Sequence, residues 1–217
     1  MPTNGTPAMR RVVKPLPAPA PQGDTVPTFR APAPRYLGPP AHTTGGDNKP
    51  ISRIVLHSTV SPCKVGGAQE IAAYFRGSGA GGSAHYVVDP SEVVQVAYDS
   101  VIAWHAPPNQ HSLGIEMCDM PDAKSAVRWD DDSHRAMLQL VAHLVAELCL
   151  AYDVPVRFIG PVRLRLGRKG ITTHANVSAA FKQSTHWDPG AWPRHRFMRM
   201  VRAEVKALRA EARKASK

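Results

Sequence analysis

The distribution of proline constrains the fold of this chain more than any other feature of its sequence. Proline recurs every few residues from residue 1 to about residue 48, in runs such as LPAPAP and APAPRYLGPP, where branched apolar residues are scarce. Such a segment favours polyproline-like extension and cannot bury enough surface to offset its ordering entropy. We therefore predict a largely irregular arm or linker over residues 1–48 and one folded domain over residues 49–217. If the arm drapes over the domain, Arg35-Tyr36-Leu37 is the cluster that can anchor it.

Length and charge limit the classes of partner. A chain of 217 residues that is 43% hydrophobic can bury one good core, and a monomer is the default expectation. The formal net charge of +10 predicts a polyanionic partner: a nucleic acid, an anionic membrane or an anionic cell wall. Aromatic residues are few and are not interleaved with the basic ones, which argues against binding of single-stranded nucleic acid. We expect no specific nucleic-acid partner.

The cysteines and the N-terminal residues bear on the compartment. Cys63, Cys118 and Cys149 lie far apart without a CxxC pair, and their odd number favours synthesis in a reducing compartment. Cys118 and Cys149 stand in apolar runs, which favours buried thiols at these two positions. The first residues lack the apolar core of a secretory signal, and no apolar run is long enough to form a transmembrane helix. We expect synthesis in the cytoplasm without a signal peptide.

Short apolar runs that alternate with amphipathic ones predict an α/β fold with a single mixed central β-sheet flanked by about three helices. The expected strands are residues 51–58, 84–89, 93–98, 102–105, 113–118 and 156–159. The expected helices are residues 68–76, 133–152 and 194–213, and residues 163–170 are expected to form a basic loop. The last helix has one apolar stripe on an otherwise basic surface. Its narrowness favours docking on the core over binding to an anionic wall or membrane.

Candidate ligands for a metal ion occur in the segment from Ile171 to Pro193. It contains His174, His186 and Asp188, and imidazole and carboxylate groups both bind zinc. A catalytic zinc takes three protein ligands and leaves a position open for water, and His57, at the end of an apolar run, is the best further donor. The spacing matches no short zinc motif. A lone histidine is more often a surface or satisfied core residue, so both interpretations stay open.

Six short runs resemble, in order, those of the zinc-dependent N-acetylmuramoyl-L-alanine amidases of the amidase-2 and peptidoglycan-recognition-protein family, and among them phage endolysins. Each run is weak alone, and together they cover about residues 51–199. The runs are Ile54-Val55-Leu56-His57-Ser58-Thr59, Ser83-Ala84-His85-Tyr86, Ala103-Trp104-His105-Ala106, Leu113-Gly114-Ile115-Glu116, Gly170-Ile171-Thr172-Thr173-His174 and Asp188-Pro189-Gly190.

The resemblance implies a site. His57, His174 and Asp188 look like the ligands of a Zn²⁺ cofactor, and some members have cysteine in place of Asp188. Glu116 is similar to the glutamate that activates the zinc-bound water, although alternation also permits a place on the solvent face. His186 stands where many members have a lysine that stabilises the oxyanion.

The resemblance also implies residues that bind substrate, and at one position this sequence departs from the family pattern. The resemblance implies that His85, Trp104 and His105 bind substrate, and Trp104 fits core packing equally well. Ala84 stands where some phage members have a functional tyrosine, which shifts the role of the base towards Glu116. The disulfide of the animal recognition proteins is missing, as expected of a bacterial or phage member.

The activity implied is hydrolysis of the amide between N-acetylmuramic acid and the L-alanine of the stem peptide. The substrate is bacterial peptidoglycan, and the basic surface is expected to hold the enzyme on anionic cell-wall polymers. A phage-type lysin of this kind would accumulate in the host cytoplasm and be released through a holin. The alternatives are a non-catalytic peptidoglycan-recognition module and, with no motif in its favour, a basic nucleic-acid-binding protein.

Overall fold

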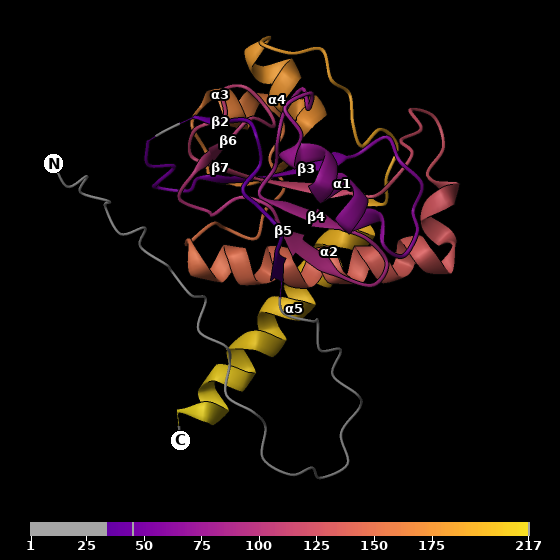
Figure 1. The fold of residues 1–217 in the computed structure, drawn as a ribbon. Helices are drawn as coiled ribbons and strands as arrows, with labels where there is room; N and C mark the ends of the chain where they lie inside the picture. The colour runs from indigo at the N-terminus through magenta and orange to yellow at the C-terminus, as the bar shows by residue number, and fades with distance from the viewer. Residues whose placement is uncertain (1–33, 45, 217) are drawn as a thin grey trace, which may run out of the picture.

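The computed structural model describes residues 34–44 and 46–216 (Figure 1). The elements in chain order are β1 (Arg35–Tyr36), β2 (Thr43–Thr44), β3 (Arg53–Ser58), α1 (Gly67–Arg76), β4 (Tyr86–Val88), β5 (Val93–Gln95), β6 (Ile102–Ala103), β7 (Ser112–Met117), the 3₁₀ helix η1 (Val127–Asp130), α2 (Asp132–Ala151), α3 (Pro161–Arg165), β8 (Gly170–Thr173), α4 (His174–Phe181) and α5 (Arg194–Ala215).

A mixed six-stranded sheet in the order β1-β5-β4-β7-β3-β8 forms the centre of the domain, as the sequence predicts. The strands β4, β7, β3 and β8 run parallel, and β5 is antiparallel to β4, to which a tight turn joins it. Asp89 closes this turn by accepting hydrogen bonds from the N–H groups of Ser91 and Glu92. The strands β2 and β6 form a second, two-stranded ribbon that the expectation of a single sheet did not include.

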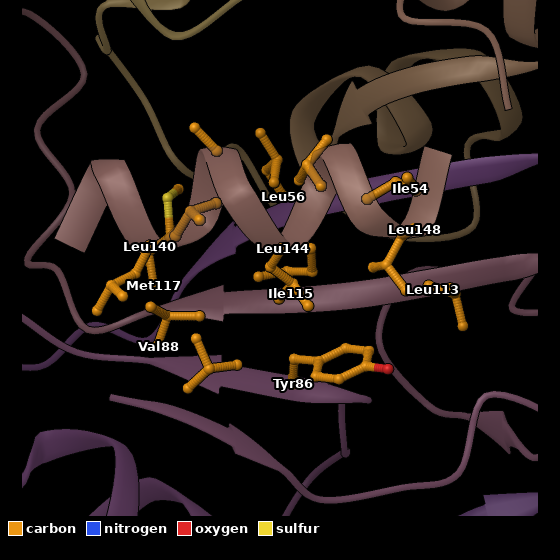
Figure 2. Packing of buried hydrophobic residues seen from close by; sticks show 14 of the residues in the cluster. Ile54, Leu56, Tyr86, Val88, Leu113, Ile115, Met117, Leu140, Leu144 and Leu148 are labelled. Atoms are coloured by element: carbon orange, nitrogen blue, oxygen red, sulfur yellow. The ribbon is translucent and has the colours of Figure 1, made fainter. Parts of the chain in front are cut away.

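Alternation along the strands divides the sheet into a core face and a site face. On the core face, buried side chains of β3, β4 and β7 pack against the apolar stripe of α2 (Figure 2). These side chains are Ile54, Leu56, Tyr86, Val88, Leu113, Ile115 and Met117 from the strands and Leu140, Leu144 and Leu148 from the helix. On the other face, Val55 packs with Ile159, Leu164 and Val177, which come from the α3–α4 region. Residues next in sequence to the core-facing ones therefore face the functional side.

The last helix is docked on the core by its first turns, which confirms the favoured interpretation. Phe197, Val201 and Val205 are buried in the main core. Glu204 ties α5 to α2 because it accepts hydrogen bonds from Gln139 at 2.7 Å and from His143 at 2.9 Å. The C-terminal turns of α5 extend beyond the body of the domain (Figure 1).

The described part of the arm lies against the domain. Arg35–Tyr36 pairs in parallel with β5, the N–H of Leu37 donates to the carbonyl of Gln95, and the ring of Tyr36 stacks on Tyr98 at 4.6 Å. The anchor predicted at Arg35-Tyr36-Leu37 is therefore confirmed. The rest of the Pro-rich arm, residues 1–33, lies outside the described residues, and the domain division at residue 48 stays a prediction.

Three expectations about elements are corrected. Five α-helices rather than about three flank the sheet in the described part of the chain. The expected strand at 156–159 is reduced to one bridge between Phe158 and Ile171, and the expected basic loop at 163–170 begins inside the short helix α3. The helix α4 was not expected, because its sequence shows no helical periodicity. Its N-terminus is capped by Thr173, whose side chain accepts a hydrogen bond from the N–H of Asn176.

Across the described residues, no helix combines the length and the apolar character needed to cross a membrane.

Candidate metal centre

The candidate metal centre lies where three segments meet on the site face of the sheet. His57 lies in β3 directly opposite Glu116 of the neighbouring parallel strand β7, and both alternate with core-facing residues. His174 begins α4 at the end of the edge strand β8. Asp188 lies in the loop before α5, and its carbonyl accepts a hydrogen bond from the N–H of Ala175. Residues far apart in sequence therefore meet at the carboxyl ends of β3, β7 and β8.

The three predicted ligands converge on one point. The Nδ1 atoms of His57 and His174 are 3.1 Å apart. The carboxylate of Asp188 places Oδ2 3.4 Å from Nδ1 of His57 and Oδ1 3.2 Å from Nδ1 of His174. All three side chains are buried, and together they form a cluster able to hold a metal ion.

A relay of hydrogen bonds orients His57. Its Nε2 lies 3.1 Å from Nδ1 of His105, and Nε2 of His105 lies 3.0 Å from Oγ of Ser112. The hydroxyl of Ser112 donates to the carbonyl of Asn109, so it accepts from His105. The protons are then assigned in sequence: His105 carries its proton on Nε2, and His57 donates from Nε2 to Nδ1 of His105. This assignment leaves Nδ1 of His57 with a free lone pair directed at the cluster.

His174 is oriented in the same manner. Its Nε2 lies 3.2 Å from Oγ of Ser184, which is hydrogen-bonded to Ser178 at 2.6 Å. With Nε2 occupied by the serine, Nδ1 of His174 faces Nδ1 of His57. Fixing the outer nitrogen of a histidine in this way is how proteins present the inner nitrogen to a metal.

The charges of the cluster favour a cation. Burial lowers the pKa of His57 to about 4, against the opposing effect of its contact with Asp188, so His57 is neutral near pH 7. The pKa of Asp188 lies well below its usual range because contacts with His174 and His57 outweigh the effect of burial. An ionised carboxylate and two imidazole rings therefore meet in a buried place, where a cation would be held by the negative charge of Asp188.

The donor set fits zinc. Two imidazole nitrogens and one carboxylate are a typical ligand set of catalytic zinc sites, which keep a fourth position open. Tetrahedral ligands at about 2.0–2.1 Å from zinc lie about 3.3–3.4 Å from one another. The two Nδ1 atoms are 3.1 Å apart, each lies within 3.4 Å of a different oxygen of Asp188, and one ligand atom from each residue can be chosen within 4.8 Å of the others. The three side chains are therefore close enough to share one ion.

Glu116 lies beside the cluster. Its Oε1 is 3.8 Å from Nδ1 of His57, and its side chain is 13% exposed, which excludes the alternative of a solvent-face glutamate. Within the described residues, its buried Oε2 has no hydrogen-bond partner. Burial, with a smaller effect of the charge on Asp188, raises the pKa of Glu116 well above its usual value. An unpaired carboxylate oxygen at this place can take a proton from a molecule bound in the site.

His186 covers the outer side of the cluster. Its ring stacks on that of His174 with centroids 4.4 Å apart and planes 8° apart, and its Nδ1 lies 3.7 Å from Oδ1 of Asp188. The side chain is 66% exposed, so a substrate can reach it. The structure thus places His186 at the rim rather than among the ligands.

The three residues expected to bind substrate lie in different surroundings. Trp104 is 44% exposed, donates from Nε1 to Thr44 and stacks on His42, so it belongs to the surface rather than the core. His105 is buried and holds His57. His85 is fully buried, with Nδ1 accepting from the N–H of Gly114 and Nε2 on the carbonyl of Val101. This geometry supports a structural role for His85 and His105 in place of direct contact with substrate.

Gly114 is required by this packing. A Cβ atom at Gly114 would lie 2.6 Å from the ring of His105, which would push His105 away from His57. The residues that sequence reasoning missed are the hydroxyl groups of Ser112 and Ser184. No motif marks them, because serine is common and each contact depends on the packing of separate segments.

Comparisons with known proteins identify the family of this chain and its fold. The family model Amidase_2, described as N-acetylmuramoyl-L-alanine amidase, matches residues 47–191. Among solved structures, hydrolase AmiA of Staphylococcus aureus is similar with a TM-score of 0.65 and 15% identity, over 84% of this chain and 88% of that one. A search among curated proteins finds no significant match.

Two further structures share the fold. A point mutant of PlyL has a TM-score of 0.52 and 15% identity, over 78% of this chain and 98% of that one. The N-acetylmuramoyl-L-alanine amidase LysC of Clostridium intestinale URNW has a TM-score of 0.50 and 15% identity, over 78% of this chain and 99% of that one. Because the family model spans most of the folded domain, this chain belongs to the Amidase_2 family of N-acetylmuramoyl-L-alanine amidases.

Proposed function

We propose that this protein is a zinc-dependent peptidoglycan amidase of the endolysin type. It hydrolyses the amide between the lactyl group of N-acetylmuramic acid and the L-alanine of the stem peptide. The observation that carries the proposal is the convergence of two imidazole nitrogens and one carboxylate at 3.1–3.4 Å, beside a buried glutamate oxygen without a hydrogen-bond partner among the described residues. Phage origin and release through a holin stay predictions from the sequence.

The chemistry requires a strong nucleophile, because an amide is a poor electrophile with a poor leaving group. A zinc ion held by His57, His174 and Asp188 would supply a water of lowered pKa and would polarise the scissile carbonyl. His105 keeps His57 in the tautomer that can bind metal through Nδ1, and Ser184 contacts Nε2 of His174 so that its Nδ1 faces the cluster. The protein groups around this centre then handle the protons and the developing charge.

Glu116 is the proposed base. The raised pKa of Glu116 lies closer to neutral pH than that of an ordinary glutamate, and a general base works best when its pKa is near the working pH. Its unpaired Oε2 accepts the proton of the attacking water, and the same group then donates that proton to the departing amine of L-alanine. Because Glu116 lies on a buried strand, it is held in place without a mobile loop.

His186 is proposed to stabilise the oxyanion from the rim of the site. Its stacking on His174 fixes the plane of the ring, and its exposure leaves the edge accessible to substrate. Loss of one such donor typically lowers the rate by about 10²- to 10³-fold. Exposed Trp104 is proposed to line the approach to the same edge.

The test uses purified cell walls and the full chain. We expect wild type to clear the walls and to release new free L-alanine amino termini, detected by mass analysis. We expect Glu116→Gln to lower the rate by about 10²-fold or more, because it removes the base without changing volume. A chelator should abolish cleavage and added zinc should restore it. Glu147→Gln, on the solvent side of α2, is the matched control and should retain wild-type activity.

Three outcomes contradict the proposal. Cleaved glycan strands without new L-alanine termini would assign a different bond. Unchanged activity of Glu116→Gln would show that Glu116 is not the general base. Tight binding to walls without any cleavage would favour the alternative of a recognition module.

A basic pocket supports the proposed binding of anionic wall polymers. Arg157, Arg163 and Arg168, with Leu166, line a cavity of about 470 Å³. Among the residues that the structure describes, none of the three guanidinium groups makes a hydrogen bond or an ion pair. Like charges that converge without counterions favour an anionic ligand, and guanidinium groups bind phosphate in a bidentate manner. No aromatic side chain lines the cavity, which disfavours stacking on bases.

Sedimentation with cell walls tests this part of the proposal. We expect the triple change of Arg157, Arg163 and Arg168 to glutamine to reduce wall binding several-fold more than the same change at Arg199, Arg202 and Arg209 of α5. The two variants have equal net charge, so they separate a specific site from general attraction. Equal losses in both would contradict the pocket. Preferential loss of DNA binding would point to nucleic acid instead.

A further inference from the structure

A buried carboxylate next to the metal centre collects four hydrogen bonds. Asp119 follows β7, is fully buried, and its pKa is low because contacts with His134, Arg128 and Ser58 outweigh the effect of burial. Its Oδ1 accepts from Nε of Arg128 at 2.7 Å and from Nε2 of His134 at 3.1 Å. Its Oδ2 accepts from Nη2 of Arg128 at 2.9 Å and from Oγ of Ser58 at 2.8 Å.

Arg128 uses every N–H group of its guanidinium. A guanidinium has five N–H donors in a fixed plane. Two of those in Arg128 bind Asp119 in a fork, and the others donate to backbone carbonyls of Ser125 at 2.8 Å, Ala191 at 3.0 Å and Pro189 at 3.0 Å. The side chain is 16% exposed. Because every N–H group of the planar guanidinium is paired, Arg128 fixes the positions of the Asp119 carboxylate and of the three carbonyl groups relative to one another.

These acceptors adjoin two of the three proposed metal ligands. Pro189 and Ala191 belong to the loop that carries Asp188. Ser58 follows His57, and while its hydroxyl binds Asp119 its backbone N–H donates to Oδ2 of Asp188 at 3.3 Å. Arg128 and Asp119 therefore join the segment of His57 to the segment of Asp188, although 130 residues separate Ser58 from Asp188.

The same loop is held against the segment before Arg128. The N–H of Ala191 donates to the carbonyl of Asp122 at 2.7 Å, and a Cβ atom at Gly190 would lie 2.4 Å from that oxygen. Gly190 has a φ of 70°, which glycine adopts without strain. These contacts hold the loop against the segment that contains Asp122, and the hydrogen bonds from Arg128 to Pro189 and Ala191 fix the position of the neighbouring Asp188.

We propose that Arg128 is a positioning residue for the metal centre, which sets the separation between His57 and Asp188 through the fork on Asp119 and the contacts with Pro189 and Ala191. This inference depends on the proposed zinc site. It concerns the affinity for zinc, because Arg128 acts on the candidate ligands through Asp119 and the backbone of Pro189 and Ala191. Lysine cannot replace it, since an ammonium group has three donors and no planar fork.

The test measures zinc affinity of the full chain by competition with a chromophoric chelator, alongside thermal unfolding of the zinc-free protein. We expect Arg128→Met and Arg128→Lys to bind zinc about 10- to 100-fold more weakly than wild type, as removal of outer partners of metal ligands typically does. Glu204→Ala is the control, because Glu204 also accepts two partly buried hydrogen bonds between elements but lies away from the site. It should lower the unfolding temperature and leave zinc affinity unchanged.

The outcomes separate this inference from the proposed function. Zinc affinity within about twofold of wild type in both Arg128 variants would overturn the inference while the zinc site stands. Full affinity in Arg128→Lys alone would overturn the role of the fork, because charge would suffice. If Arg128→Met does not fold, Arg128→Lys decides, since it keeps a positive charge beside Asp119. A wild type that cleaves walls but binds no zinc would overturn both the site and the inference.

Discussion

At the scale of single residues, the site depends on which nitrogen of each histidine is free. His57 and His174 turn Nδ1 to the cluster because His105 and Ser184 occupy their Nε2 atoms. The sequence predicts the three ligands through the family resemblance. It cannot predict the partners that orient them, because those contacts join segments that are distant along the chain. The sequence around His85 likewise does not predict that this side chain is buried, which is the reason for its structural role.

One prediction at this scale concerns the relay behind His57. We expect His105→Ala to weaken zinc binding by about 10- to 100-fold, because Nε2 of His57 loses its acceptor and the ring is free to change tautomer. Ser112→Ala should have a smaller effect in the same direction, since His105 itself remains. Chelator competition measures both. Unchanged affinity in His105→Ala would show that packing alone orients His57.

At the scale of elements, alternation predicts the strands that matter most. In β7, Leu113, Ile115 and Met117 face α2 while Glu116 faces the cluster, which is the division the sequence implies (Figure 2). The elements α3 and α4 escape prediction because they are five and eight residues long, too short to show a helical period. Their positions follow from packing on Val55 and on the edge strand β8.

The division into two faces allows stability to be separated from the site. Leu144 of α2 is packed against the core face, opposite the cluster. We expect Leu144→Ala to lower the free energy of unfolding by about 2–5 kcal/mol through loss of buried contacts and a cavity. Zinc affinity of the folded variant should be unchanged. Chemical denaturation and chelator competition measure the two quantities, and a matching loss of zinc affinity would show that the faces are coupled.

At the scale of the whole molecule, buried and partly buried histidines link stability to pH. Burial lowers the pKa of His134, but hydrogen bonds to Asp119, Cys63 and Asp131 outweigh it and raise the value to about 10. A pKa above the unfolded value of 6.5 means that the protonated form stabilises the fold. This contribution is fully present below pH 6.5 and is lost as the pH rises towards 10. His143, with a pKa raised to about 8 by Glu147 and Glu204, acts in the same direction.

We therefore expect the unfolding temperature of the zinc-free protein to fall between pH 6.5 and pH 10. In His134→Gln, which cannot be protonated, the slope over this range should be shallower. Scanning calorimetry across the range measures the difference between the two slopes. Identical slopes in wild type and variant would show that His134 does not carry the charge that its contacts imply.

We propose that His57, His174 and Asp188 share one ion at the centre of the molecule's activity. Anomalous X-ray diffraction at the zinc absorption edge, on crystals of the full chain grown with zinc, locates that ion. We expect one strong peak within bonding distance of Nδ1 of His57, Nδ1 of His174 and the carboxylate of Asp188. A protein that cleaves peptidoglycan but shows no peak there, or shows its peak at other ligands, would rule out an ion shared by these three residues.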